Sequence, residues 1–331
     1  MSFQPPVSLI IPNFNGAQLL RENLPTVRSA LLAYPGGGRV IVVDDGSTDA
    51  SLDVLKNEFP DVHCVIHAEN RGFSEAIHSG VHAATDEVLI LLNSDVQPEP
   101  DFIAPLVARL EGANVFAVQS AIRVDQPAPH PYCLSRYVFR LGALKRLPTP
   151  DLGLEGWLCL YASGGSMAVS REKFLALGGF LPLLKPFYWE DFDLGVRAWR
   201  RGWETWLEPR SLVLHQEKGS IRDHVKKRKI RWALQRNKLL AEWIHYPALS
   251  LLLTAPPRIL IRLLLRMLSG DVGYVSALLS ALSKWPEVLK IRREIREGAR
   301  MNFKTVLRTI EEENAGHTEL DPPRSGGCCG V

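Results

Sequence analysis

The sequence predicts an α/β fold with a doubly wound, mostly parallel sheet and a helical C-terminal extension. Three observations lead to this prediction. Short aliphatic runs alternate with helix-like patterns over the first hundred residues, a polar segment follows each run, and the composition becomes basic and helix-rich after residue 217. Alternating strands and helices imply parallel strands with right-handed connections. A chain of 331 residues with 46% apolar residues can fill a large core.

The strands are expected where four short runs are rich in β-branched and aliphatic residues, which is typical of strands buried on both faces. These runs are Val7–Ile11, Val40–Val43, Val62–Ile66 and Val88–Leu92. Helical periodicity occupies the segments between them. The expected helices are Ala17–Ala33, Asp49–Glu58 and Ser74–Ala84.

Composition divides the chain further. Residues 1–217 are expected to form one domain with two halves, about 1–100 and about 101–217, bridged by the proline-rich loops of residues 125–160. Residues 218–315 form a basic, amphipathic helical region, and residues 316–331 a disordered tail.

The helical region carries much of the positive charge. Residues 218–304 hold 19 of the 39 Lys and Arg residues but only six acids, although the whole chain has a net charge of only +3. The spacing of four residues between Arg258, Arg262 and Arg266 places them on one side of a helix that is otherwise rich in leucine. Such a helix fits an anionic membrane surface, and the alternative is packing on the domain with a solvated basic face.

The sequence also bears on location. The segment Met1–Pro6 lacks the basic region of a signal peptide, and the uncharged stretch Trp243–Pro257 is shorter than a spanning helix. The five cysteines form no CxxC pair, which favours a reducing compartment. We therefore expect a cytoplasmic protein without a transmembrane helix, peripheral on the inner face of a membrane if the basic helices bind lipid.

A polar segment follows each expected strand. The carboxyl ends of parallel strands share one sheet edge, and ligands of open α/β sheets bind there. A crevice for a nucleotide and its phosphates is therefore expected at this edge. Its segments are Pro12-Asn13, Asp44–Asp49, Glu69–Gly72 and Asn93–Asp95.

Individual side chains at this edge suit parts of a nucleotide. The carboxylates of Asp44 and Asp45 can accept hydrogen bonds from a base N–H or a ribose hydroxyl. Asn70 and Arg71 precede a helix and suit an anion or a base edge, although close packing explains the small residues of that helix equally well. Asp95 can hold Mg²⁺ or Mn²⁺, with an Asx-type turn as the alternative.

A second acidic cluster lies at Trp189–Asp193, where three acids stand among aromatic residues. A carboxylate beside aromatic walls becomes more basic by desolvation, so it can deprotonate a hydroxyl. The alternative is a helix cap. His215 ends another apolar run, as a structural histidine or a metal ligand.

The ordered set of motifs resembles the family 2 glycosyltransferases, inverting enzymes of the GT-A fold, and within them the rhamnosyltransferase-like bacterial branch. The resemblance covers about residues 7–240. Its motifs are Val7–Asn15, Val42–Asp49, Asn70–Phe73, Leu92–Asp95, Gly164–Met167, Gly178–Phe180, Glu190–Leu194, Arg201-Gly202 and His215.

The resemblance implies a role for each motif residue. Residues 1–100 would be the donor half and 101–217 the acceptor half. Asp191 would be the general base, with Glu190 beside it, and a metal would be held by Asp95 and His215. The nucleoside-diphosphate sugar would contact Pro12, Asn13, Asp44, Asp45, Asn70, Arg71, Gly72 and Asn93. The saccharide or lipid-linked acceptor would contact Gly164, Trp189 and Asp193, which places the chain in cell-envelope polysaccharide synthesis.

Two positions depart from the family pattern. The metal motif is commonly Asp-x-Asp, but Asn93 stands first here, and Leu181-Pro182 follows Gly178–Phe180 where relatives often have Asp-Glu. One alternative is therefore a degenerate sugar-nucleotide-binding module. Another is a sugar nucleotidyltransferase, although the glycine-rich, basic loop that holds a triphosphate is missing after the first strand. Dinucleotide and P-loop motifs are absent, and nucleic acid is not an expected partner.

Overall fold

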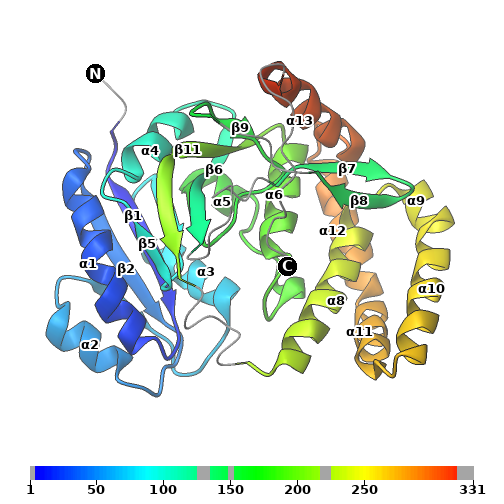
Figure 1. Cartoon of the computed structure of the whole chain (residues 1–331), viewed down its shortest axis with the longest axis horizontal. Coiled ribbons are helices and arrows are strands. Elements are labelled where there is room, and N and C mark those ends of the chain that lie inside the picture. The colour runs from blue at the N-terminus through cyan, green and yellow to red at the C-terminus, as the bar shows by residue number, and fades with distance from the viewer. Residues whose placement is uncertain (1–3, 125–134, 148–152, 217–224, 319–331) are drawn as a thin grey trace.

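The computed structural model describes residues 4–124, 135–147, 153–216 and 225–318. Its centre is a nine-stranded sheet with the order β3-β2-β1-β4-β10-β6-β11-β5, and β9 pairs with β11 (Figure 1). The first four strands in this order are mutually parallel, whereas β10 is antiparallel to both of its neighbours. The strands are β1 Val7–Asn13, β2 Gly38–Asp44, β3 His63–Ile66, β4 Val88–Leu92, β5 Val96–Pro98, β6 Val115–Val124, β9 Trp157–Leu158, β10 Ser166–Ser170 and β11 Glu204–His215.

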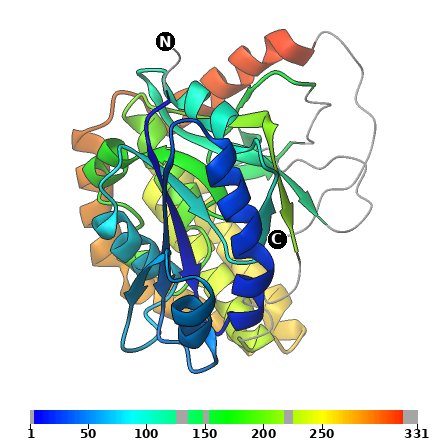
Figure 2. The same cartoon turned by 90° about the vertical axis from the view of Figure 1, so that its left-hand side faces the viewer.

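Helices cover both faces of the sheet. One core cluster joins one face to apolar residues of α1, α2 and α4, and a second joins the other face to α3, α5 and α6. Figure 2 shows α1 along the outside of the parallel strands. These helices are α1 Ala17–Ala33, α2 Ser51–Glu58, α3 Phe73–Ala83, α4 Ile103–Leu110, α5 Arg171–Ala176 and α6 Glu190–Arg200. The predicted doubly wound, mostly parallel sheet is confirmed.

One prediction about the strands is wrong. The segment Val62–Ile66 was expected to be buried on both faces, but β3 is the edge strand, and Ile66 is 61% exposed. An edge strand has a neighbour on one side only, so less of its surface is covered. The small residues of α3 serve close packing: a β-carbon added at Gly80 would lie 2.3 Å from a methyl carbon of Ile10 in β1.

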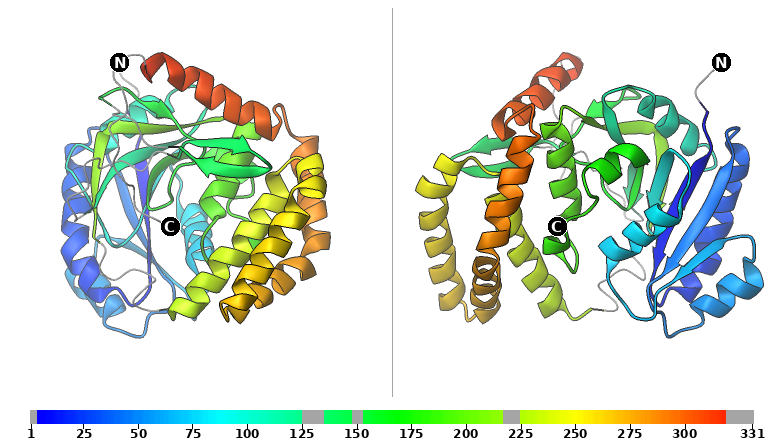
Figure 3. Two further views of the ribbon diagram at one scale, coloured as in Figure 1. Left: turned by 45° about the vertical axis from the view of Figure 1, so that its right-hand side comes forward. Right: turned by 180° about the vertical axis from the view of Figure 1, so that it is seen from behind.

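The C-terminal helices form a layer beside the sheet domain (Figure 3). Helix α8 packs against α11, α12 and α6, and α13 returns to α6 and β9. The helices are α8 Lys227–His245, α9 Ala248–Leu253, α10 Ala255–Leu268, α11 Val272–Ser283, α12 Trp285–Glu297 and α13 Phe303–Thr318, and a hairpin of β7 Tyr137–Arg140 and β8 Ala143–Arg146 adjoins them. No helix in the described ranges is long and apolar enough to cross a membrane. The predicted tail begins inside α13, and residues 319–331 lie outside the described residues.

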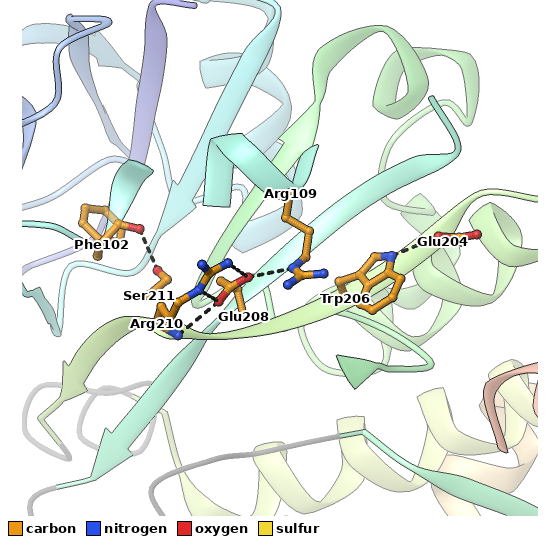
Figure 4. A network of polar contacts seen from close by, with 7 residues as sticks. All are labelled: Phe102, Arg109, Glu204, Trp206, Glu208, Arg210 and Ser211. Carbon is orange, nitrogen blue, oxygen red and sulfur yellow. Dashed lines mark hydrogen bonds and ion pairs between the residues drawn. The ribbon is translucent and has the colours of Figure 1, made fainter. Parts of the chain in front are cut away.

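A buried charge network fixes a bend in β11 (Figure 4). The register between β11 and β6 shifts between Glu208 and Leu212. The Glu208 carboxylate is fully buried and pairs with Arg109 and Arg210, each at 2.7 Å, while Ser211 Oγ donates to the carbonyl of Phe102 at 2.8 Å. Beyond the bend, β11 pairs with β5, and this pairing brings its last residue, His215, opposite Val96.

Candidate functional site

The loop after β2 is organised by its two acids. The Asp44 carboxylate accepts hydrogen bonds from Asn13 Nδ2 at 2.9 Å and from the backbone N–H of Ser47 at 3.0 Å. Pro12 and Asn13 end the neighbouring strand β1, so the ends of β1 and β2 are tied together. Asp44 is fully buried.

Asp45 connects this loop to the next one along the edge. Its carboxylate accepts from the backbone N–H groups of Arg71 at 2.9 Å and Gly72 at 2.7 Å, and its Oδ1 lies 2.6 Å from Nδ1 of His67. The side chains of Asn70 and Arg71 remain exposed. The oxygens of Asp45 already have protein partners, whereas the exposed side chains of Asn70 and Arg71 are open to a ligand.

Asp95 and His215 are brought together although 120 positions separate them. Asp95 Oδ2 lies 3.4 Å from His215 Nε2, and Asp95 Oδ1 is buried without a hydrogen-bond partner in the described part of the chain. The bend of β11 produces this approach, because it pairs the end of β11 with the strand that starts one residue after Asp95.

A pair of glycines joins this motif to the second acidic cluster. The backbone N–H of Asn93 donates to the carbonyl of Gly165 at 3.0 Å. A β-carbon at Gly164 would lie 2.8 Å from Asp191 Oδ1, so any larger residue there would collide with the carboxylate. The 93–95 segment and Asp191 therefore flank the same turn, and Phe73, next to Gly72 of the Asp45 loop, also contacts Gly164.

Glu190 and Asp191, the acids that begin α6, have raised pKa values. Burial raises the pKa of Asp191 to about 6, opposed by a backbone hydrogen bond from Gly164. Burial, and then the charge of Asp191, raises the pKa of Glu190 to about 8. Glu190 Oε2 and Asp191 Oδ1 have no hydrogen-bond partner within the described residues, and Asp191 remains partly accessible whereas Glu190 is only 7% exposed. Asp191 thus combines raised basicity with a buried Oδ1 that has no hydrogen-bond partner in the described chain, on a residue that is only partly exposed.

The loop before these acids is held in an uncommon conformation by α8. Tyr188 and Trp189 both have left-handed backbone angles, with φ of 73° and 76°. Asn237 of α8 is fully buried, and its Nδ2 donates to the carbonyls of Phe187 at 3.0 Å and Tyr188 at 3.1 Å. Arg236 donates to the carbonyl of Leu183 at 3.0 Å. The helical region therefore shapes the loop that presents Glu190 and Asp191.

The structure gives Asp193 other partners than the expected acceptor. It is fully buried, pairs with Arg197 at 2.7 Å, and lies 2.8 Å from Nε2 of His245. These groups lower its pKa despite burial. Trp189, in contrast, is partly exposed, with the Lys238 ammonium over its ring at 5.9 Å.

Sequence reasoning missed Arg236, Asn237 and His245, the α8 residues that reach α6 and its preceding loop. The sequence did carry one signal for them. Two adjacent polar residues, Arg236-Asn237, precede the apolar segment Leu239–Ala241 in the basic helical region.

Comparisons with known proteins identify a family and a fold. The family model described as Glycosyl transferase family 2 matches residues 8–177. A pre-mycofactocin glycosyltransferase of Mycobacterium tuberculosis is 28% identical over 229 residues, which are 66% of this chain and 44% of that protein. A dodecaprenyl-phosphate galacturonate synthase of Rhizobium johnstonii is 31% identical over 109 residues, 32% of each chain. The chain thus spans less than half the length of these relatives.

Two solved structures share the fold. GalNAc-T7 with UDP, GalNAc and Mn²⁺ has a TM-score of 0.66 at 18% identity, covering 97% of this chain and 59% of that one. A mannosyltransferase from Pyrobaculum calidifontis in complex with GDP-Man and Mn²⁺ has a TM-score of 0.52 at 18% identity, covering 96% and 89%. The likeness confirms the expected GT-A fold.

Proposed function

The chain belongs to glycosyl transferase family 2, and from that premise we propose that it is an inverting enzyme with Asp191 as its general base. It would move a sugar from a nucleoside-diphosphate sugar to a hydroxyl of a saccharide or lipid-linked acceptor. The observation that carries this proposal is the Asp191 carboxylate, which has a raised pKa and one buried oxygen without a hydrogen-bond partner in the described chain, on a partly exposed residue. It flanks the Gly164-Gly165 turn, which contacts the 93–95 segment of the donor edge.

The donor would occupy the carboxyl edge of the parallel strands. Asp44 and Asp45 hold the two loops there, and the exposed Asn70 and Arg71 would meet the nucleoside or its phosphates. Pro12, Asn13 and Asn93 line the ends of β1 and β4 at this edge. The two similar structures contain UDP and GDP-Man, which supports a nucleoside diphosphate as the ligand class.

The donor atoms present fit a divalent cation. The partnerless Asp95 Oδ1 and the neighbouring His215 imidazole supply one carboxylate and one nitrogen ligand. Within the described residues there is no cluster of three or more His, Cys, Asp or Glu side chains, so diphosphate oxygens and water would complete the coordination. When bound, Mg²⁺ or Mn²⁺ supplies positive charge that offsets the charge growing on the leaving diphosphate.

The chain's own residues would carry the proton transfer. Asp191 accepts the proton from the acceptor hydroxyl while that oxygen forms a bond to the anomeric carbon. The bond from this carbon to the diphosphate oxygen breaks, and its electron pair leaves with the nucleoside diphosphate, so the configuration inverts. Glu190 is predominantly neutral at pH 7, because of its raised pKa, and so adds little competing charge beside the base.

The acceptor is proposed to be associated with a membrane. Two of the relatives are named as prenyl-phosphate sugar transferases or synthases. Helices α9 and α10 expose large apolar side chains, and Arg258, Arg262 and Arg266 recur along α10. A peripheral position on an anionic membrane fits this combination. The exposed residues are Leu249, Leu252, Leu253, Leu260, Ile261, Leu264, Leu265, Met267 and Leu268.

A donor screen tests the proposal. Purified protein is incubated with a panel of sugar nucleotides, with and without Mn²⁺, and release of nucleoside diphosphate is measured. We expect turnover of at least one donor and its loss in Asp191→Asn. Retained donor binding without turnover of any donor, across acceptors, would favour the degenerate binding module instead.

The metal assignment has its own test. We expect Asp95→Ala to weaken donor binding about tenfold in the presence of Mn²⁺ and to leave metal-free binding unchanged, because it removes a charged ligand. Calorimetric titration with and without Mn²⁺ measures both. Equal weakening under the two conditions would assign Asp95 to the donor itself.

A further inference from the structure

A groove on the helical side of the molecule is lined mainly by arginines. It has a volume of about 320 Å³ and lies between the end of α6, the end of α8 and the middle of α12. Figure 3 shows α6 and α12 side by side in the view from behind. The lining residues are Arg200, Ile244, Leu289, Arg292, Arg293 and Arg296.

No acidic residue is among those that line this groove in the described structure. None of the four arginines forms an ion pair with a carboxylate in the described part of the chain. Arg292 is fixed by carbonyls at the end of α8, since its Nη1 donates to Ile244 and to Tyr246, each at 3.0 Å. Arg200 Nε donates to the carbonyl of Met301 at 3.4 Å. Arg293 and Arg296 are exposed and keep their donors available.

Holding these arginines together without an anion is unfavourable. Burial lowers the pKa of Arg200, and the charge of Arg292 lowers it further; burial and the charge of Arg296 do the same to Arg292. Charged groups are rarely collected and partly desolvated without a partner of opposite charge. Guanidinium groups bind phosphate through paired, charge-assisted hydrogen bonds, which makes a phosphate the natural partner.

A glycine beside the groove gives space to a further arginine. A β-carbon at Gly298, one residue after α12, would lie 2.7 Å from Nε of Arg201, so a further guanidinium packs against bare backbone next to the groove. The rim is apolar on one side. Leu289 lines the groove and is 49% exposed, and Trp285, four residues earlier on the same face of α12, is 40% exposed.

We propose that this arginine groove binds the phosphate group of a phosphorylated ligand, carried by a lipid headgroup or free in solution. The groove is separate from the donor site. Asp191 and Arg200 lie nine residues apart on α6, which corresponds to about 14 Å along the helix axis. The inference does not depend on the proposed transfer reaction, because it concerns other residues and needs no turnover.

The test uses the full chain and a matched pair of variants. Arg293→Gln/Arg296→Gln removes the two exposed arginines of the groove. Lys290→Gln/Lys304→Gln removes two exposed positive charges outside it, from α12 and α13. The melting temperature of each protein is measured at increasing concentrations of inorganic pyrophosphate. Binding is measured to phosphatidylcholine vesicles with and without phosphatidic acid. The donor site is intact in all three proteins, so any shift it contributes is common to them.

We expect pyrophosphate affinity at the groove to fall about tenfold or more in the arginine variant and not in the lysine variant. A matching loss of binding to phosphatidic acid vesicles identifies a lipid phosphate as the source. Loss of the pyrophosphate response with unchanged vesicle binding identifies a free phosphate. Equal responses of the two variants to both probes would overturn the proposal.

Discussion

The proposed active site contains two pairs of adjacent acids, and the two pairs differ in their hydrogen-bond partners. Asp44 ends β2 and Asp45 follows it. Both are buried, and they accept hydrogen bonds from backbone N–H groups and, at Asp44, from Asn13. Glu190 and Asp191 begin α6, and each has an oxygen without a partner in the described chain. Burial raises the pKa of both Glu190 and Asp191.

This difference shows that the hydrogen-bond partners of a buried carboxylate determine its role. Several hydrogen-bond donors satisfy the buried oxygens of Asp44 and Asp45, so these side chains serve to hold loops. At Asp191 burial outweighs the backbone hydrogen bond from Gly164 and raises the pKa, which suits proton transfer. We expect the first pair to control structure and donor affinity, and the second to control turnover.

The largest expected effect comes from changing Asp191, in the acid pair that begins α6. Asp191→Asn keeps the shape of the side chain but removes its basicity, so kcat should fall about a hundredfold to ten-thousandfold while donor binding is retained. Turnover and calorimetric donor titration measure the two quantities. Asp53→Asn, on the exposed side of α2, is the control and should behave like the wild type. Near-normal turnover in Asp191→Asn would remove this residue from the base role.

Changing the partnered pair should act on stability. Asp45→Asn cannot accept all the hydrogen bonds from Arg71, Gly72 and His67, so unfolding should become easier by about 1–3 kcal/mol. Urea unfolding measures this difference, again with Asp53→Asn as the control. An unchanged unfolding midpoint would show that the loop does not need the carboxylate.

The pH dependence of turnover should separate the pairs further. A general base must be deprotonated, and the pKa of Asp191 is raised to about 6. Turnover should therefore fall about tenfold per pH unit below pH 6. The pH profile of kcat/KM reports the pKa of this base in the free enzyme. A decline that begins only near pH 4 would indicate a carboxylate of ordinary pKa.

The smallest effect concerns Glu190. Its folded pKa of about 8 lies above the ordinary value of 4.5, so the folded state retains a proton that the unfolded state loses. Stability is then lost as the pH rises from about 4.5 to 8. Glu190→Gln should match the wild type near pH 4.5 and melt about 2–5 °C higher at pH 9. A difference between the two proteins that does not vary with pH would argue against a buried neutral glutamic acid.

The donor edge could be predicted from sequence because its signals are local. Helix Ala17–Ala33 and strand Val88–Leu92 have the predicted bounds, since apolar periodicity and the polar residues after each run lie within single segments. The partners of the acids could not be predicted. Asp193 meets His245 across 52 positions, and Asn237 reaches Tyr188 across 49, so these contacts depend on how α8 packs. The edge position of β3 likewise depends on strand order.

The hydrogen bonds that α8 donates to the 183–188 loop make the sheet domain depend on the C-terminal helices. A protein cut at residue 217 would lose Asn237 and Arg236, and the carbonyls they hold would need new partners. The C-terminal helices therefore cannot be exchanged between enzymes as an independent unit. A graft would preserve chemistry only if its first helix brought the same amide to the same place.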